Sequence, residues 1–243
     1  MKNLFIYAAV IAATMGSMTA CSDFLDVKPV TNKQEPDFVS QEGITQLLTG
    51  MYARLNSTDA NDGYFRSTLT NYVYGDVMGG DANKGSTFQD QPDFTSLETY
   101  TFTTDNAYFE TKWAHSYHGV FTANNVIKVA DLAKEELSAI AGQSKDFYTE
   151  TIARFIRGFF HFEVVKLFGA AVPYVDDIAM KENVNPQVSN VDENGNYIYI
   201  WDKIVEDLQF AYDNLPDTWT EAGRVNKWAA GAMLAKVKMY QSA

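Results

Sequence analysis

The stretch ARFIRGFFHFEVVKLFGAAVPYV, residues 153–175, shows the pattern that decides the fold class of this chain. Apolar side chains recur there at steps of three and four residues, which predicts an amphipathic helix over residues 145–168. The apolar face of this helix consists of Ile152, Phe155, Ile156, Phe159 and Phe162. Gly169 stands where a left-handed C′ residue ends many helices, and Pro173 prevents any continuation.

Four other segments repeat this spacing, and together they predict an all-α fold. One helix follows Ser40, and a longer one follows Asp105, which we expect to be its N-cap. A further helix stops at Leu215, and the last begins near Asn226. Consecutive helix pairs bury each other's apolar faces when they stack, so we expect a repeat-like architecture, although a strict 34-residue period is absent.

Two long loop excursions and an uncapped last helix complete the pattern. The excursions cover residues 56–104 and 169–196. The last helix runs to the chain end without a terminating signal, and no later segment could cover its apolar stripe. We expect this stripe to be exposed; it consists of Ala230, Met233, Leu234 and Val237. We therefore interpret the chain as the front portion of a longer protein, truncated before its C-terminal half, and expect it to aggregate or to be partly ordered in isolation.

The N-terminus resembles the signal of a bacterial lipoprotein. Lys2 lies in a short positive n-region, and Leu4–Met18 form an apolar run of signal-peptide length, too short for a spanning helix. Small residues then lead into Cys21, the only cysteine of the chain. An acylated Cys21 would tether the mature chain to a bilayer without spanning it, and two or more acyl chains would make the anchor lasting. The alternative is an ordinary secretory signal with a chance cysteine at its edge.

These features predict three regions. Residues 1–20 form the signal peptide, residues 21–37 the lipidated cysteine with a polar tether, and residues 38–243 the helical domain. The chain is acidic, with a formal net charge of −12, so it lacks the basic footprint of nucleic-acid-binding proteins. Aromatic residues make up 14% of the chain, which is more than helical core packing usually demands.

Four segments together resemble the SusD/RagB family of nutrient-binding lipoproteins. They are FLDVKP at residues 24–29, just after Cys21, the quoted stretch at residues 153–175, IWDKIVEDLQFAYDNLP at 200–216 and GRVNKWAAGAMLAKVKMY at 223–240. Each motif alone is modest, but their order and spacing across the mature chain make the combination specific.

The resemblance implies both a fold and a role. The fold is a set of tetratricopeptide-like helix pairs, and family members are roughly twice this length. The role is that of a lipoprotein on the outer membrane of a Gram-negative cell, facing outward over a TonB-dependent, SusC-like transporter. Members capture oligosaccharides, or in some cases peptides, without catalysis. The resemblance thus implies no cofactor. Asp23 and Asp26 also resemble the acidic residues that follow the cysteine in surface-exported lipoproteins of this type.

Candidate sites for metal or phosphate chemistry are weak. His115 and His118 lie three residues apart on a predicted helix, but a third metal ligand is not evident. GGDANKGST at residues 79–87 has the glycine spacing of a phosphate loop, yet Ser86 stands where the lysine should follow. DANDG at residues 59–63 starts like a calcium loop, but its glycine comes one position early. We therefore predict neither a metal site nor catalytic residues.

Two arginines on the apolar third helix call for charged partners. Arg154 and Arg157 could bind an anion. We expect them instead to pair with carboxylates and to set the helix register. The candidate partners are Glu150, Glu163 and the Glu206-Asp207 pair.

The first excursion is the best candidate for ligand binding. Between residues 64 and 102 it mixes aromatic side chains with acids and amides. Sugar rings stack their C–H faces on aromatic surfaces, and their hydroxyls need directional polar partners. The ligand-binding residues that we predict are Tyr74, Asp76, Asp81, Asn83 and Phe94. Some of the aromatic residues are expected simply to pin the loop to the helices.

Two other functional classes stay open at this point. A glycoside hydrolase needs two carboxylates flanking one bond, and the acids here show no readable pairing. A helical scaffold that binds only proteins would explain the helix pairs and the lipid anchor, but predicts no aromatic–polar ligand site. Capture of an oligosaccharide, or alternatively of a peptide, is the function that the sequence favours.

Overall fold

The computed structural model describes residues 38–55, 72–141, 145–182, 188–220 and 222–242. Phe38–Ala243 forms one compact unit, and Met1–Asp37 is assigned to another. The predicted signal peptide, Cys21 and the tether therefore lie outside the described residues.

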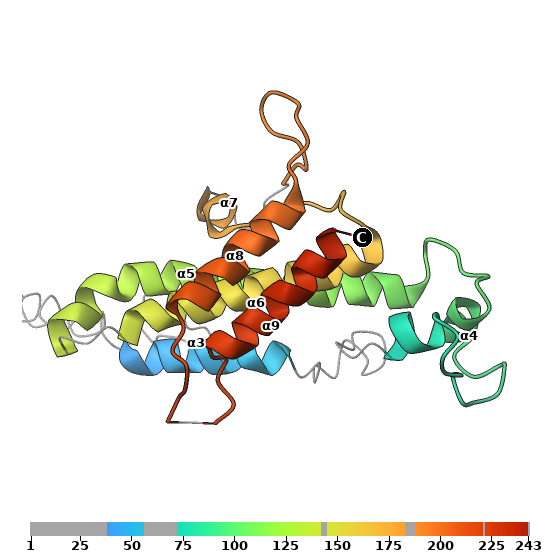
Figure 1. Cartoon of the computed structure of the whole chain (residues 1–243), viewed down its shortest axis with the longest axis horizontal. Coiled ribbons are helices and arrows are strands. Elements are labelled where there is room, and N and C mark those ends of the chain that lie inside the picture. Colours follow the sequence, from blue (N-terminus) through green and yellow to red (C-terminus); the bar gives the residue numbers. More distant parts are fainter. Residues whose placement is uncertain (1–37, 56–71, 142–144, 183–187, 221, 243) are drawn as a thin grey trace, which may run out of the picture. The chain divides into compact units, whose positions relative to one another are not determined.

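The described residues are helical (Figure 1). The elements are α3 (Gln41–Arg54), the π-helix η2 (Tyr72–Val77), α4 (Pro92–Glu98), α5 (Ala107–Ala141), α6 (Lys145–Phe168), α7 (Asp177–Glu182), α8 (Ile200–Asn214) and α9 (Lys227–Gln241). Over these ranges, β pairing is limited to one isolated bridge between Val191 and Tyr197. The predicted all-α class is confirmed.

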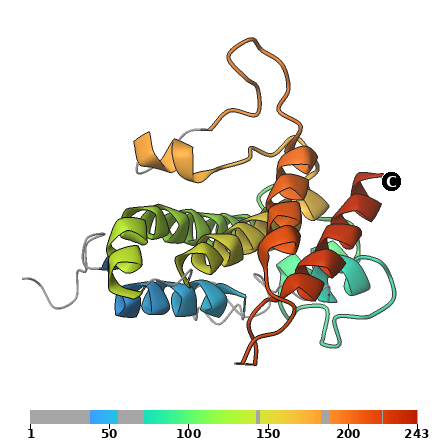
Figure 2. The same cartoon turned by 60° about the vertical axis from the view of Figure 1, so that its left-hand side comes forward.

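Two antiparallel helix pairs form the scaffold. Contacts between α5 and α6 run in opposite order along the two helices, from Lys112–Glu163 at one end to Lys134–Glu150 at the other. The second pair, α8 and α9, packs on α6, and α3 packs on α5 (Figures 1 and 2). Such packing of apolar faces stabilises the shorter helices in particular, since isolated helices of 14 or 15 residues, the length of α3, α8 and α9, are marginal in water.

The main core lies where the two pairs meet. Its fully buried side chains include Ile156, Phe160 and Phe162 of α6, and Ile204 and Leu208 of α8. Each such side chain contributes roughly 1.5–3 kcal/mol through removal from water. This core explains why the stretch quoted above specifies the fold: α6 contacts α3, α5, α8 and α9.

A glycine permits close contact within the first pair. A Cβ placed on Gly119 of α5 would lie 2.3 Å from ring carbons of Phe160. No real contact of this kind is so short, so the Phe160 ring occupies the space that a side chain at position 119 would need. Gly119 therefore sets the distance between α5 and α6 at this point.

Most predicted helix ends agree with the structure. The Ser40 side chain accepts a hydrogen bond from the Gly43 N–H at 3.0 Å and caps α3. Gly169 follows α6 with a φ of +79°, and its N–H donates to the Val165 carbonyl. The Asp105 cap is wrong by one residue: the Asn106 side chain accepts from the Tyr108 N–H at the start of α5. The Asp105 carboxylate accepts a hydrogen bond from Thr103 instead.

The prediction of an exposed stripe on α9 is wrong. Ala230, Leu234 and Val237 are at most 7% exposed because α8 covers them, and Met233, the fourth member of the stripe, is half-buried. The opposite side of α9 is the exposed one, with Trp228 and Met239 at 58% and 72%. Sequence periodicity showed which face of the helix is apolar, but could not show that the preceding helix already covers it.

Candidate functional site

Residues 72–106 form a folded unit at the start of α5, which we call the loop cluster (Figures 1 and 2). Its small core is made of Val73, Val77, Phe94 and Leu97 together with Tyr108 of α5. η2 and α4 supply most of this core. Neither was predicted, because six- and seven-residue helices are too short to show a helical period.

Lys84 organises the polar half of the loop cluster. Its Nζ donates to the carbonyl oxygens of Thr87 and Asp90 and to the Thr95 hydroxyl. The Tyr72 hydroxyl in turn donates to the Lys84 carbonyl oxygen at 3.3 Å. The segment 79–87, whose glycine spacing resembles a phosphate loop, thus uses its lysine to close the loop on itself.

The five predicted ligand residues fall into two groups. Tyr74 and Phe94 belong to the small core: Phe94 is 3% exposed, and the Tyr74 hydroxyl donates to the Tyr108 carbonyl oxygen at 2.7 Å. Asp76, Asp81 and Asn83 are exposed on one turn, where the Asp76 carbonyl oxygen accepts from the Asp81 N–H at 2.9 Å. The structure therefore buries Phe94, leaves Tyr74 half-buried against the small core, and exposes the three polar residues.

A continuous series of aromatic rings runs from the loop cluster onto the two long helices. We call it the aromatic row. Its members, in order of contact, are Tyr100, Phe102, Phe109, Phe168, Trp113 and Tyr117. Neighbouring ring centroids lie between 4.8 and 6.4 Å apart, the range of favourable edge-to-face and tilted aromatic pairs. Part of the row faces solvent: Tyr100 is 64% exposed, Trp113 38% and Phe102 37%.

The aromatic row was not predicted as a unit. Trp113 and Tyr117 lie four residues apart on α5. Phe168 ends α6, more than fifty residues away in sequence, and its ring joins Phe109 to Trp113. This pair of aromatic residues four positions apart is the only local signal for the aromatic row, and helical core packing gives the same signal.

Charged side chains next to the aromatic row form buried ion pairs. The Lys112 ammonium lies 2.9 Å from the Glu163 carboxylate, and both side chains are at most 5% exposed. Lys166 also pairs with Glu163. Burial lowers the pKa of Lys112, and the neighbouring Glu163 carboxylate offsets part of that shift. The Lys112 ammonium also lies 5.8 Å from the centre of the Tyr74 ring, which stacks on Phe109.

A second buried network clamps the loop after α6. The Arg157 guanidinium donates to both carboxylate oxygens of Asp207 at 2.8 and 2.7 Å, and its Nη1 donates to Asn124 and Asp177. Burial would lower the pKa of Arg157, but the hydrogen bonds and charge of Asp207 outweigh it and raise that pKa. The Tyr174 hydroxyl donates to Asp207 at 2.7 Å. Four separate elements are thereby joined through one side chain.

The predicted arginine pairs are confirmed. Arg157 bonds Asp207, and Arg154 bonds Glu150 at 3.0 Å. Glu163, another candidate partner, forms ion pairs with Lys112 and Lys166 instead.

The two histidines considered for metal binding have different surroundings. His115 is 1% exposed, and its Nε2 lies 3.2 Å from the Arg54 carbonyl oxygen, whereas His118 is exposed. Within the described ranges, no three His, Cys, Asp or Glu side chains come together as a metal site would need. The DANDG segment, residues 59–63, lies outside the described residues.

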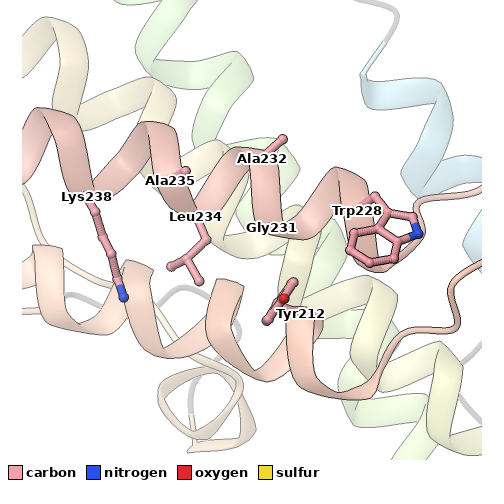
Figure 3. A pocket seen from close by; sticks show the side chains of 7 residues that line it. All are labelled: Tyr212, Trp228, Gly231, Ala232, Leu234, Ala235 and Lys238. Atoms are coloured by element: carbon pink, nitrogen blue, oxygen red, sulfur yellow. The ribbon is translucent and has the colours of Figure 1, made fainter.

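A separate hollow lies between α8 and α9, with a volume of about 410 Å³ (Figure 3). Its lining residues are Tyr212, Trp228, Gly231, Ala232, Leu234, Ala235 and Lys238. Leu234 and Lys238 point toward α8, and Tyr212 points toward α9. This hollow offers few polar groups for a hydroxyl-rich ligand, so the aromatic row is the better candidate site.

Residues 23–239 match the model of a family described as "Starch-binding associating with outer membrane", a SusD-like family. The match covers most of the chain. This chain belongs to the SusD-like family. The family prediction made from the four sequence motifs is confirmed.

Two curated relatives carry the same family name. The SusD-like protein P2 of Formosa agariphila is 28% identical over 227 residues, covering 91% of this chain and 40% of that protein. A SusD-like protein of Bacteroides ovatus is 27% identical over 234 residues, covering 96% of this chain and 39% of that protein. The chain thus spans about two fifths of the length of the curated relatives it matches.

The fold also agrees with a solved SusD-like structure. The crystal structure of a SusD homolog from Bacteroides thetaiotaomicron superposes with a TM-score of 0.59 at 24% identity, over 84% of this chain and 38% of that one. The stacked helix pairs are accordingly of the tetratricopeptide-like kind. In the part of the chain that the structure describes, no helix has both the length and the apolar composition needed to cross a bilayer.

Proposed function

We propose that this chain belongs to a cell-surface lipoprotein that captures an oligosaccharide and delivers it to a TonB-dependent, SusC-like transporter. Membership of a family described as starch-binding and outer-membrane-associated supports the proposal. The structural observation that carries it is the aromatic row, whose Tyr100, Phe102 and Trp113 face solvent on a helical scaffold.

The chemistry of the row suits sugar rings. A pyranose presents an apolar C–H face that stacks on an aromatic ring, and its hydroxyls require acceptors and donors at the edge of that face. The exposed Asp76, Asp81 and Asn83 of the loop cluster are the polar partners that we propose. Tyr74 and Phe94 would support the site from within the loop cluster, since their rings pack in its core.

The rigidity of the scaffold favours binding over chemistry. Three rings of the row lie on α5 and one ends α6, so they are fixed by helix packing and need little ordering when a ligand arrives. A row of stacking rings supplies affinity without a nucleophile or an acid–base pair. We therefore propose capture without catalysis and without a cofactor.

A binding screen tests this function. The complete protein, without its lipid-bearing cysteine, is titrated calorimetrically with a panel of oligosaccharides and peptides. We expect Trp113→Ala to weaken oligosaccharide binding about tenfold, since exposed tryptophans are among the side chains that carry most of the energy of a binding surface. Trp228→Ala is the matched control, because Trp228 is also an exposed tryptophan, lies on α9 and lines the separate hollow.

The outcomes separate the alternatives. Binding of peptides alone would retain capture and change the cargo. Loss of binding in Trp228→Ala instead of Trp113→Ala would move the site to the hollow between α8 and α9. Absence of binding to every oligosaccharide and peptide of the panel would contradict small-ligand capture and favour a protein-binding scaffold.

The proposed anchor has its own test. Cys21→Ser should release the protein from the outer membrane into the soluble fraction, since the thiol that carries the lipid is lost. Protease accessibility on intact cells would report whether the anchored protein faces outward. Membrane retention of the Cys21→Ser protein would contradict lipid anchoring at this residue.

A further inference from the structure

The chain segment that carries five of the six rings of the aromatic row is acidic. Residues 72–127 contain seven acidic residues, two lysines and no arginine. The acids are Asp76, Asp81, Asp90, Asp93, Glu98, Asp105 and Glu110. Any ligand that reaches Trp113 or Tyr100 therefore approaches an anionic surface.

The described lysines near the row already form hydrogen bonds or ion pairs within the protein. Lys84 directs its Nζ to three oxygen acceptors within the loop cluster. Lys112 is 3% exposed and paired with Glu163. Lys166, two residues before Phe168, is 17% exposed and shares the same carboxylate. An anionic group on a ligand would have to break one of these arrangements to gain a cationic partner.

Glu110 places one negative charge beside the exposed rings. It lies three residues before Trp113 on α5, so the two side chains share a helix face, and it is exposed. Asp105 is also exposed, in the segment between Phe102 and Phe109, and its hydrogen bond from Thr103 favours the ionised form by lowering its pKa. The aromatic faces add to this effect, because their quadrupole is negative above the ring.

We propose that the aromatic row selects neutral oligosaccharides and rejects those built from uronic acid or sulfated sugars. This inference rests on the proposed capture function and states which class of sugar the site takes. A neutral sugar can bind this surface without a charge conflict, since it offers C–H faces to the rings and hydroxyl donors to the proposed polar partners Asp76 and Asp81. A uronate or a sulfate ester meets like charge at Glu110 and Asp105, and the described lysines Lys84, Lys112 and Lys166 already have acceptors within the protein. Like-charge juxtaposition is a strong source of discrimination.

The test uses pairs of oligosaccharides that differ only in charge. Oligogalacturonides and their fully methyl-esterified forms share one backbone, and desulfated and sulfated galactans form a second pair. Further neutral glucans and mannans are compared with their carboxyl-bearing oxidised forms. We expect the neutral member to bind at least about tenfold more tightly at low salt. The difference should shrink as ionic strength rises, because salt screens exposed charges.

A charge reversal on α5 provides the second measurement. Glu110→Lys should improve binding of the anionic member by about three- to tenfold and leave the neutral member within about twofold. Glu206→Lys is the matched control: it makes the same charge change on α8, at a residue whose side chain is 62% exposed. The control should change neither member, because its charge lies outside the row.

The result that would overturn the inference differs from the one that would overturn the function. Equal or tighter binding of the anionic member, with Trp113→Ala weakening it, contradicts selection for neutral sugars and leaves capture at the row intact. Binding that Trp113→Ala does not change, or no binding of either member in any pair, contradicts the proposed function at this row and the inference with it.

Discussion

Arg157 shows how one side chain can join separate parts of this molecule. It is 4% exposed and bonds Asp207 through two hydrogen bonds, with Asn124 and Asp177 as further acceptors. The sequence predicted that Arg157 would need a carboxylate, because an arginine on an apolar helix face must be paired. Selection of Asp207 over Glu163 depended on the packing of α8 against α6.

Removal of this guanidinium should be costly. Arg157→Met leaves the Asp207 carboxylate buried without its cation, and we expect a loss of about 3–5 kcal/mol in the free energy of unfolding. Arg154→Met is the matched control one turn earlier on α6. Arg154 is 27% exposed and pairs with Glu150, so its loss should cost no more than about 1 kcal/mol. Equal effects of the two variants in urea unfolding would contradict the distinction.

His161 makes the free energy of unfolding depend on pH. Its Nδ1 lies 3.0 Å from the Arg157 carbonyl oxygen and donates to it, while its Nε2 accepts from the Val175 N–H. This arrangement holds the ring neutral, and burial together with the Arg157 charge lowers the pKa of His161 to about 3. The unfolded chain binds a proton near pH 6.5 and the folded chain does not, so stability is lost as pH falls below 6.5.

The expected loss can be measured against a variant. The contribution of His161 should fall by ~1.4 kcal/mol per pH unit below about pH 6. The stability advantage of the native chain over His161→Gln should therefore narrow by roughly 2 kcal/mol between pH 7 and pH 5. In NMR spectra of the folded protein, the His161 ring should remain neutral with the proton on Nδ1 at pH 5. A ring that titrates near its ordinary pKa would contradict the buried arrangement.

At the scale of elements, the helices follow from local signals and their spacing from tertiary contacts. The predicted limits of α6, residues 145–168, agree with the structure, as do the Ser40 cap and the Gly169 end. η2, α4 and α7 were not predicted, because short helices depend on the side chains that pack against them. The close approach of α5 to α6 at Gly119 also has no local signal.

Two glycines in helices should respond in opposite directions to the same substitution. Gly119→Ala forces a methyl group against the Phe160 ring, and we expect a loss of about 1–3 kcal/mol in the free energy of unfolding. Gly50→Ala on α3 meets nothing within 4 Å and should stabilise the protein by roughly 0.5–1 kcal/mol, since alanine is the better helix former. Thermal unfolding of both variants checks this difference in sign.

At the scale of the whole molecule, the loop cluster and the main core are separate hydrophobic units. The loop cluster packs around Phe94, and the main core lies between the helix pairs. The rings of Phe109 and Phe168 and the Lys112–Glu163 pair connect the region of the loop cluster with α6. Because its core is small, the loop cluster should open at a lower free energy than the helices.

Hydrogen exchange can show this separation. Phe94→Ala should raise amide exchange throughout residues 72–106, with a local loss of about 3–5 kcal/mol, and leave protection in α6 nearly unchanged. Leu208→Ala, a truncation in the main core, should lower protection in α6 and α8 by about 2–5 kcal/mol. Uniform loss of protection in both variants would mean that the two cores unfold as one unit.

The sequence by itself determined the long helices, the Ser40 cap, the Gly169 end, the need of Arg154 and Arg157 for carboxylates, and the family, because each depends on spacing along the chain or on the chemistry of single residues. The tertiary structure alone decided which apolar faces meet and which side chains reach solvent. The stripe of α9 was predicted as exposed and is buried by α8, while Phe94 was selected as a ligand residue and lies in a core. The aromatic row combines Phe102, Trp113 and Phe168 from three elements, and only the packing of those elements brings the rings together.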